Sequence, residues 1–154
     1  MARGTYSGPE DCNCLAVRQA ARHITQFYDQ LLAPSGLRTT QFSILAKLRR
    51  LGPMTINALA AEMVMDRTTL GRNILPLERD GLVIVEQGSR DRRSKELRVT
   101  EAGEARFRAG MKGWAKAQRH FEKAFGAERT ADMRILLHAV AATRLGTHAA
   151  SAEK

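Results

Sequence analysis

The sequence predicts a mainly α-helical domain that carries one small β-hairpin. Apolar residues recur every three or four positions over most of the 154 residues, and this period changes to two between residues 82 and 99. A composition of 44% hydrophobic and 27% charged residues is that of one folded domain and excludes general disorder. No apolar run approaches the ~18 residues that span a bilayer, so no membrane protein is expected.

The N-terminal part of the chain is expected to begin without regular structure and then to form two helices. Residues 1–11 are rich in Gly, Pro and Ser and are expected to be disordered. Apolar side chains recur at helical spacing over 12–32 and again over 39–50, and a Pro and a Gly follow each segment. These signals predict one long helix and one shorter helix.

Two more helices with recognisable N-caps follow. Thr55 can cap a helix over 56–63, and Asp66 can cap a helix that runs to Asp80, because their side-chain oxygens accept hydrogen bonds from otherwise unpaired amides. The last of these helices has an inward apolar stripe. Its opposite face presents groups that can bind base edges or phosphates, namely Arg67, Thr68, Thr69, Arg72 and Asn73.

The β-hairpin surrounds a strongly basic loop. Residues 82–85 and 96–99 read as antiparallel strands, and the loop over 87–95 (QGSRDRRSK) is too polar to pack inside. We expect the acid in this loop to hold its shape while the cations face outward. With four cations and one acid the loop has a net charge of +3, from Arg90, Arg92, Arg93 and Lys95 against Asp91.

This order of elements predicts a winged helix-turn-helix. The major groove of B-DNA admits one helix, and a narrow basic hairpin can reach the minor groove, where the potential is most negative. A net charge of +9 favours an anionic partner, with nucleic acid first and an anionic membrane surface second. Taken alone, the polar helix face fits an ordinary solvated surface better than a DNA contact. The basic loop by itself favours DNA over a solvated hairpin tip, and combined with the loop the helix face favours DNA as well.

Three stretches resemble the MarR family of bacterial transcription regulators. Residues 59–72 (LAAEMVMDRTTLGR) resemble its helix-turn-helix, and residues 77–83 (LERDGLV) resemble its exit into the wing. Asp91-Arg92-Arg93-Ser94 followed by residues 97–103 (LRVTEAG) is similar to its most specific motif. The pattern of one helix before this core and two after it extends the resemblance over about residues 12–146.

The resemblance implies a homodimer on a pseudo-palindromic operator, most simply a repressor that a small molecule or an oxidant releases. An independent reason for a dimer is the long helix after Thr100, whose apolar stripe exceeds what so small a monomer can cover. The expected organisation is a disordered segment (1–11), a dimerisation helix (12–36), the winged helix-turn-helix (37–100), two C-terminal dimerisation helices (101–146) and a flexible tail (147–154).

Two residues depart from the family pattern. Val64 stands where such motifs usually have Gly, so we expect a turn without positive φ. Pro76 lies inside the recognition helix, lacks an amide hydrogen and crowds the carbonyl of Arg72, so we expect a kink or a loosened last turn. Neither departure removes the base-facing half of that helix.

The signal that such a regulator would sense is left open by the sequence. Cys14 lies where the hydroperoxide-sensing branch of the family has a reactive cysteine, but the sequence favours Cys12 and Cys14 as small residues of a mobile segment over a redox sensor. A metal site is the weakest alternative, because Cys-x-Cys with His23 has no recognised zinc spacing. By resemblance, a small aromatic or anionic ligand would bind in a cleft lined by Arg18, Arg22, His23, Tyr28 and Phe42.

Other classes of function are weaker readings. The sequence has no Gly-rich phosphate loop, nucleophile elbow or HExxH motif, so we expect neither an enzyme nor a cofactor. An architectural protein that coats DNA, or a winged helix that binds only proteins, would share the fold. With two cysteines and no apolar leader, we expect a cytoplasmic protein.

Overall fold

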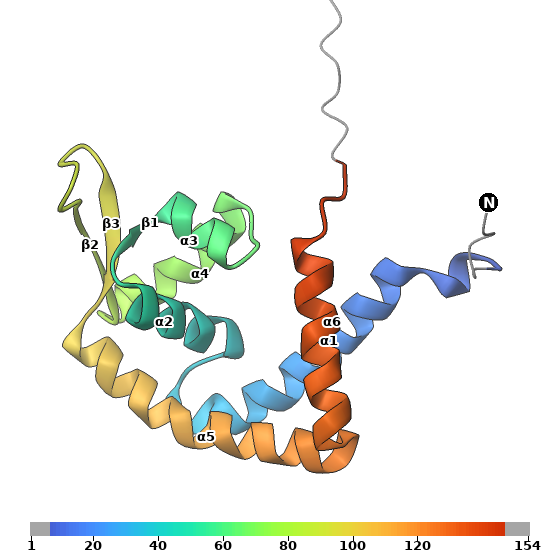
Figure 1. Cartoon of the computed structure of the whole chain (residues 1–154). Helices are drawn as coiled ribbons and strands as arrows, with labels where there is room; N and C mark the ends of the chain where they lie inside the picture. Colours follow the sequence, from blue (N-terminus) through green and yellow to red (C-terminus); the bar gives the residue numbers. More distant parts are fainter. Residues whose placement is uncertain (1–6, 147–154) are drawn as a thin grey trace, which may run out of the picture. The chain divides into compact units, whose positions relative to one another are not determined.

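The computed structural model describes residues 7–146, so the expected flexible tail and most of the expected disordered N-terminus lie outside the described residues. The expectation of a mainly helical chain with a small antiparallel sheet is confirmed (Figure 1). In order, the elements are η1 (Pro9–Asp11), α1 (Asn13–Leu32), η2 (Ala33–Ser35), α2 (Thr39–Leu51), β1 (Met54–Thr55), α3 (Ile56–Glu62), α4 (Arg67–Arg79), β2 (Val83–Gln87), β3 (Lys95–Val99), α5 (Glu101–Phe125) and α6 (Ala127–Ala142).

The chain forms two compact units, with the boundary between Gln118 and Arg119 inside α5. No helix of residues 7–146 is long and apolar enough to cross a membrane. Pro9–Asp11 form a short 3-10 helix where we expected no regular structure. The reason is local, because the backbone amide and hydroxyl of Ser7 both donate to the carboxylate of Asp11.

Side-chain caps set the starts of three helices. Thr55 Oγ1 accepts from the amide of Ala58 at 3.2 Å and begins α3, while Asp66 Oδ1 accepts from the amide of Thr69 at 2.8 Å and begins α4. Both caps confirm the sequence-based prediction. Cys12 is the N-cap of α1, and its Sγ accepts from the amide of Leu15 at 3.4 Å.

The sheet has three antiparallel strands in the order β1-β3-β2. The sequence predicted β2 and β3 but not β1, a two-residue strand whose Met54 lies opposite Leu97. Val85 faces Leu97 from the other side of β3. Figure 1 shows β2 and β3 as a hairpin that projects beyond the helices, which is the predicted wing.

The core of the first unit lies among α2, α3, α4 and the sheet. Its fully buried side chains include Ile44 and Leu45 of α2, Leu59 of α3 and Leu70 of α4. The aromatic rings of Phe42 and Phe107 stack with centroids 4.7 Å apart, so α5 packs directly on α2. This packing connects the start of α5 with the winged core.

Two glycines bring α5 close to its neighbours. A Cβ on Gly103 would lie 2.1 Å from the carbonyl oxygen of Leu82, and a Cβ on Gly113 would lie 2.1 Å from that of Leu31. No side chain fits at either contact. The two positions therefore hold α5 against the start of the wing and against the end of α1.

The second unit contains the last turns of α5 and all of α6. Gly126 separates the helices with φ 99°, and Thr130 Oγ1 donates to its carbonyl oxygen at 2.7 Å. The guanidinium of Arg129 lies 4.3 Å from the ring centroid of Phe125. Large apolar side chains of α6 are nevertheless exposed in the single chain, namely Ile135, Leu136, Leu137 and Val140.

Candidate nucleic-acid interface

The polar face of α4 lies at the surface, as the sequence predicted. The apolar stripe of the helix is buried, with Leu70 0%, Ile74 4% and Leu77 1% exposed. Of the predicted contact residues on the opposite face, Arg67, Thr68, Thr69 and Arg72 are exposed and Asn73 is half-buried. The helix therefore offers this face to a partner while its stripe is fixed in the core.

Two of these predicted contact residues are also bound to α4 itself. Thr69 Oγ1 donates to Asp66 Oδ2 at 2.6 Å, and this hydroxyl followed by the amide of Thr69 lowers the pKa of the Asp66 carboxyl. Asn73 Nδ2 donates to the carbonyl oxygen of Thr69 at 2.9 Å. Thr69 and Asn73 thus stabilise the first turns of the helix, and Arg67, Thr68 and Arg72 are the side chains without such a bond among the described residues.

The turn between α3 and α4 corrects one expectation. We expected no positive φ at Val64, but its φ is 52°, in the left-handed region. This conformation closes α3, because the amide of Val64 donates to Ala61 O at 3.1 Å and the amide of Met65 to Ala60 O at 2.9 Å. That pair of hydrogen bonds is the Schellman motif, so the hydrogen bonding of the helix end overrides the preference of a β-branched residue.

Pro76 does not interrupt the recognition helix. α4 continues through it to Arg79, and its end is closed by a hydrogen bond of 3.0 Å from the amide of Asp80 to Pro76 O. The amide of Leu82 then donates to Leu77 O at 2.8 Å and leads the chain into the wing. The predicted loosening of the last turn is therefore absent from the hydrogen bonding.

The tip of the wing is ordered by the single acid that the sequence singled out. The carboxylate of Asp91 accepts from the amide of Arg93 at 2.9 Å, and Asp91 O accepts from the amide and hydroxyl of Ser94. Gly88 lies beneath this turn, where a Cβ would be 2.1 Å from Ser94 Oγ. The prediction that Asp91 holds the loop shape is confirmed, and the need for glycine at position 88 was not predicted.

The stem of the wing has its own ion pair. Arg98 of β3 donates to both carboxylate oxygens of Glu86 on β2, at 2.9 Å and 2.6 Å. Hydrogen bonding to Arg98 lowers the pKa of Glu86, and the same bond raises the pKa of Arg98. This pair was not predicted from the sequence, although opposite charges in the two strands of a hairpin are a signal for such a contact.

In the part of the chain that the structure describes, the cations predicted to contact DNA are not paired with acids, unlike two other arginines near them. Arg98 is paired with Glu86 and Arg79 with Asp80. Within residues 7–146, no carboxylate forms an ion pair with any of the six predicted DNA-contacting cations, all of them exposed: Arg67, Arg72, Arg90, Arg92, Arg93 and Lys95. The chain therefore presents positive charge that its own acids do not neutralise.

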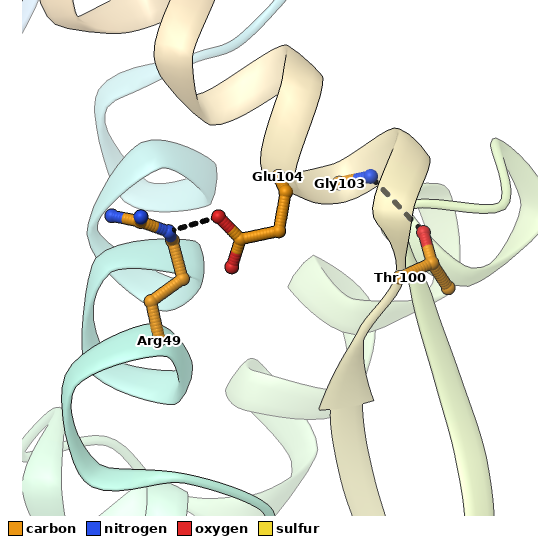
Figure 2. A network of polar contacts seen from close by, with 4 residues as sticks. All are labelled: Arg49, Thr100, Gly103 and Glu104. Atoms are coloured by element: carbon orange, nitrogen blue, oxygen red, sulfur yellow. Dashed lines mark hydrogen bonds and ion pairs between the residues drawn. The ribbon is translucent and has the colours of Figure 1, made fainter.

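A polar junction attaches α5 to the winged core (Figure 2). Arg49 Nε of α2 donates to Glu104 Oε2 of α5 at 2.6 Å, and the same guanidinium lies 4.2 Å from the ring centroid of Phe107. Thr100 Oγ1 accepts from the amide of Gly103 at 3.0 Å and donates to Gly81 O at 2.6 Å. The start of α5 is thereby tied both to α2 and to the entry of the wing.

The predicted ligand-cleft residues fall into two environments. Tyr28 and Phe42 are buried, with the Tyr28 hydroxyl hydrogen-bonded to Gln118. Arg18, Arg22 and His23 are exposed on α1. A hollow of about 320 Å³ lies between the end of α1 and α5, and its lining includes Leu31, Ser35 and Lys116. None of the five predicted ligand-cleft residues lines it.

Both cysteines are free thiols at the surface. Cys12 is the N-cap of α1 described above, and Cys14 lies in the first turn of that helix. Their exposure makes them accessible to an oxidant. That Cys14 reacts with an oxidant remains a prediction.

The arrangement of α3, α4 and the β2–β3 hairpin defines a winged helix-turn-helix protein. The MarR family model matches residues 37–95, which include α3, α4, β2 and the loop of the wing and end at the first residue of β3. The transcriptional regulator MosR of M. tuberculosis, crystallised in complex with DNA, is 38% identical and superimposes with a TM-score of 0.74 over 88% of this chain and 100% of that one. The chain belongs to the MarR family.

Two further proteins are similar to this chain. The uncharacterized HTH-type transcriptional regulator YwoH of Bacillus subtilis (strain 168) is 34% identical over 91 residues, which are 59% of this chain and 66% of that protein. A variant of MarR from E. coli, complexed with operator DNA, is 20% identical and has a TM-score of 0.72 over 81% of this chain and 90% of that one. At that identity the last likeness concerns the fold alone.

Proposed function

We propose that this protein is a sequence-specific, DNA-binding transcription regulator that acts as a homodimer. α4 enters a major groove, and the tip of the wing lies against the adjacent minor groove. The observation that carries the proposal is the set of six exposed cations on α4 and the wing that no described carboxylate neutralises. The phosphates of DNA would supply the negative charge that neutralises these cations.

The likeness to MosR, whose crystal structure contains DNA, supports the same conclusion. The ordered tip of the wing supports it as well, because Asp91 holds the loop backbone that carries the cations before binding. Less ordering entropy is then lost when the complex forms.

The dimer is supported by the apolar side chains that a single chain leaves in water. Ile135 and Leu136 of α6 are 67% and 66% exposed, and Leu15 and Val17 of α1 are 42% and 44% exposed. Apolar area removed from water stabilises an interface by roughly 25 cal/mol per Å². A second copy of the chain would cover these faces and set the distance between two recognition helices.

Repression with release by a small molecule or an oxidant is the regulatory part of the proposal. A signal that changes the distance between the two α4 helices weakens binding to two successive major grooves, about 34 Å apart. The signal must itself bind the two arrangements with different affinity. For the oxidant case, peroxide should release DNA from the wild type and from Cys12→Ser, whereas Cys14→Ser should stay bound.

The DNA-binding proposal is tested by selection from a random duplex library, followed by fluorescence anisotropy on the enriched duplex. Arg92→Ala/Arg93→Ala should lower the affinity at least tenfold and reduce the salt dependence by about two counterions. Lys112→Ala/Lys116→Ala removes the same charge from exposed positions on α5 and is the matched control. Equal losses for both double variants, or equal binding to every duplex, would instead indicate an architectural DNA-coating protein.

The dimer is tested by sedimentation equilibrium of the full chain. We expect twice the monomer mass of 17.1 kDa. Leu136→Lys should sediment as a monomer to a larger extent than the wild type. Its helical circular dichroism should be unchanged, because Leu136 is 66% exposed within one chain. A wild-type protein that sediments as a monomer at micromolar concentration would overturn the proposal.

A further inference from the structure

One large apolar side chain lies on the polar face of α4. Leu75 is 64% exposed, whereas the three leucine and isoleucine side chains of the buried stripe are at most 4% exposed. Residues three, four and seven apart share one face of a helix, so Leu75 lies in line with Thr68, Gly71 and Arg72. An exposed leucine inside a polar face gains nothing from the fold of this chain.

Gly71, one turn before Leu75, is also unexplained by the fold. A Cβ at Gly71 would meet no atom within 4 Å, and its φ is not in the left-handed region. Glycine is among the poorest helix formers, so its presence lowers the stability of α4 relative to alanine. Without a side chain at this position, a partner can approach the backbone of α4 on the face that contacts DNA in the proposed function.

We propose that Leu75 determines sequence specificity by contacting the 5-methyl group of a thymine, and that Gly71 lets the DNA approach the helix closely enough for this contact. The inference rests on the proposed DNA binding of α4. The thymine methyl is the apolar group that base pairs expose in the major groove, and an apolar side chain is its matching partner. Arginine, threonine and asparagine on the same helix supply the polar contacts.

The position of Leu75 on α4 suits this role. Seven residues separate it from Thr68, a rise of about 10 Å along the helix, which is within the ~12 Å width of a major groove. Arg72 lies between them on the same face, and Arg67 precedes them. Exposed cations around one apolar side chain fit the edge of a thymine flanked by phosphates better than they fit an apolar protein surface.

The test uses the duplex enriched from a random library, with each thymine replaced in turn by deoxyuridine. Deoxyuridine keeps the hydrogen-bonding groups of thymine and lacks only the methyl. At one or two positions in each half-site, the wild type should bind the deoxyuridine duplex about three- to fivefold more weakly. Leu75→Ala should bind the two duplexes equally, and circular dichroism should show that it remains folded.

Gly71→Ala provides an independent readout. It should raise the melting temperature, because alanine favours a helix and meets no atom of the chain, yet it should weaken binding to the enriched duplex at least fivefold. If Gly71 had only a structural role, Gly71→Ala would lower the melting temperature and the DNA affinity together. Unchanged affinity in Gly71→Ala would show that DNA does not approach this position and would overturn the proposed contact.

The outcomes separate this inference from the proposed function. An enriched duplex whose binding ignores every thymine methyl, or a Leu75→Ala variant with wild-type sensitivity to deoxyuridine, would overturn the inference alone. Failure to enrich any duplex would overturn DNA binding and the inference with it. If Leu75→Ala kept full DNA affinity but lost binding to another protein, Leu75 would belong to a protein interface and the inference would be overturned.

Discussion

The carboxylate of Asp91 accepts a hydrogen bond of 2.9 Å from the backbone amide of Arg93 at the tip of the wing. An acid on a surface proposed to bind phosphate is unfavourable electrostatically, so its value must lie in the shape that it imposes. Two substitutions separate charge from shape, because asparagine keeps the acceptor oxygen and alanine removes it.

We therefore expect Asp91→Asn to bind DNA at least as tightly as the wild type, since it removes a negative charge and keeps the turn. Asp91→Ala should bind about three- to tenfold more weakly than Asp91→Asn, because the loop must then be ordered on binding. Anisotropy titrations of the three proteins on one duplex check this. Equal affinities of the two variants would show that the hydrogen bond does not organise the wing.

Replacement of Val64 by glycine should stabilise the protein. Val64 has φ 52° and is 74% exposed, so it loses little packing on replacement and the left-handed strain of a β-branched residue is relieved. We expect Val64→Gly to raise the free energy of unfolding by about 1 kcal/mol. Urea denaturation measures it, with Val64→Ala as the control that keeps a Cβ and should gain less.

The Arg49–Glu104 ion pair should contribute modestly to stability and in a salt-dependent way. Their side chains are 34% and 33% exposed, and pairs with such exposure typically contribute up to about 1 kcal/mol. Glu104→Gln should cost no more than this, and the cost should shrink in 1 M NaCl. Arg49→Met should cost more, because the guanidinium also loses its contact with Phe107. A double-mutant cycle would contradict this account if the coupling were zero in low salt.

Asp66 should make the stability of the winged core depend on acid pH. Hydrogen bonds from Thr69 lower its pKa below the ordinary 3.8 in the folded state. A carboxyl with a depressed folded pKa contributes stability above its unfolded pKa and loses it as the pH falls through the folded value. The stability difference between the wild type and Asp66→Asn, which can still cap the helix, should therefore shrink below pH 3.8. A constant difference between pH 6 and pH 2.5 would contradict this.

Local signals predicted most of the elements correctly. Thr55 and Asp66 cap the two helices of the helix-turn-helix motif, and the period-two segments form β2 and β3. These predictions succeeded because a cap or an alternating strand depends on residues a few positions apart. Asp91 belongs to the same group, since its acceptor and the donor of Arg93 are two residues apart.

Contacts between distant residues were not predictable in this way. β1 is a strand only because Met54 pairs with Leu97, and the junction of α2 with α5 depends on Arg49 and Glu104, which are 55 residues apart. The sequence also did not show that Gly103 is the place where α5 approaches Leu82 O. At Val64 the sequence rule failed because two hydrogen bonds at the end of α3 outweighed a residue preference.

The sequence by itself determined the order of helices and strands, the caps of α3 and α4 and the positive charge of the wing, because each of these follows from neighbours along the chain. Tertiary structure decided which cations are neutralised by acids and how α5 is fixed to the winged core. Those outcomes depend on which surfaces meet in three dimensions, and burial and charge pairing are settled only when the surfaces are in contact.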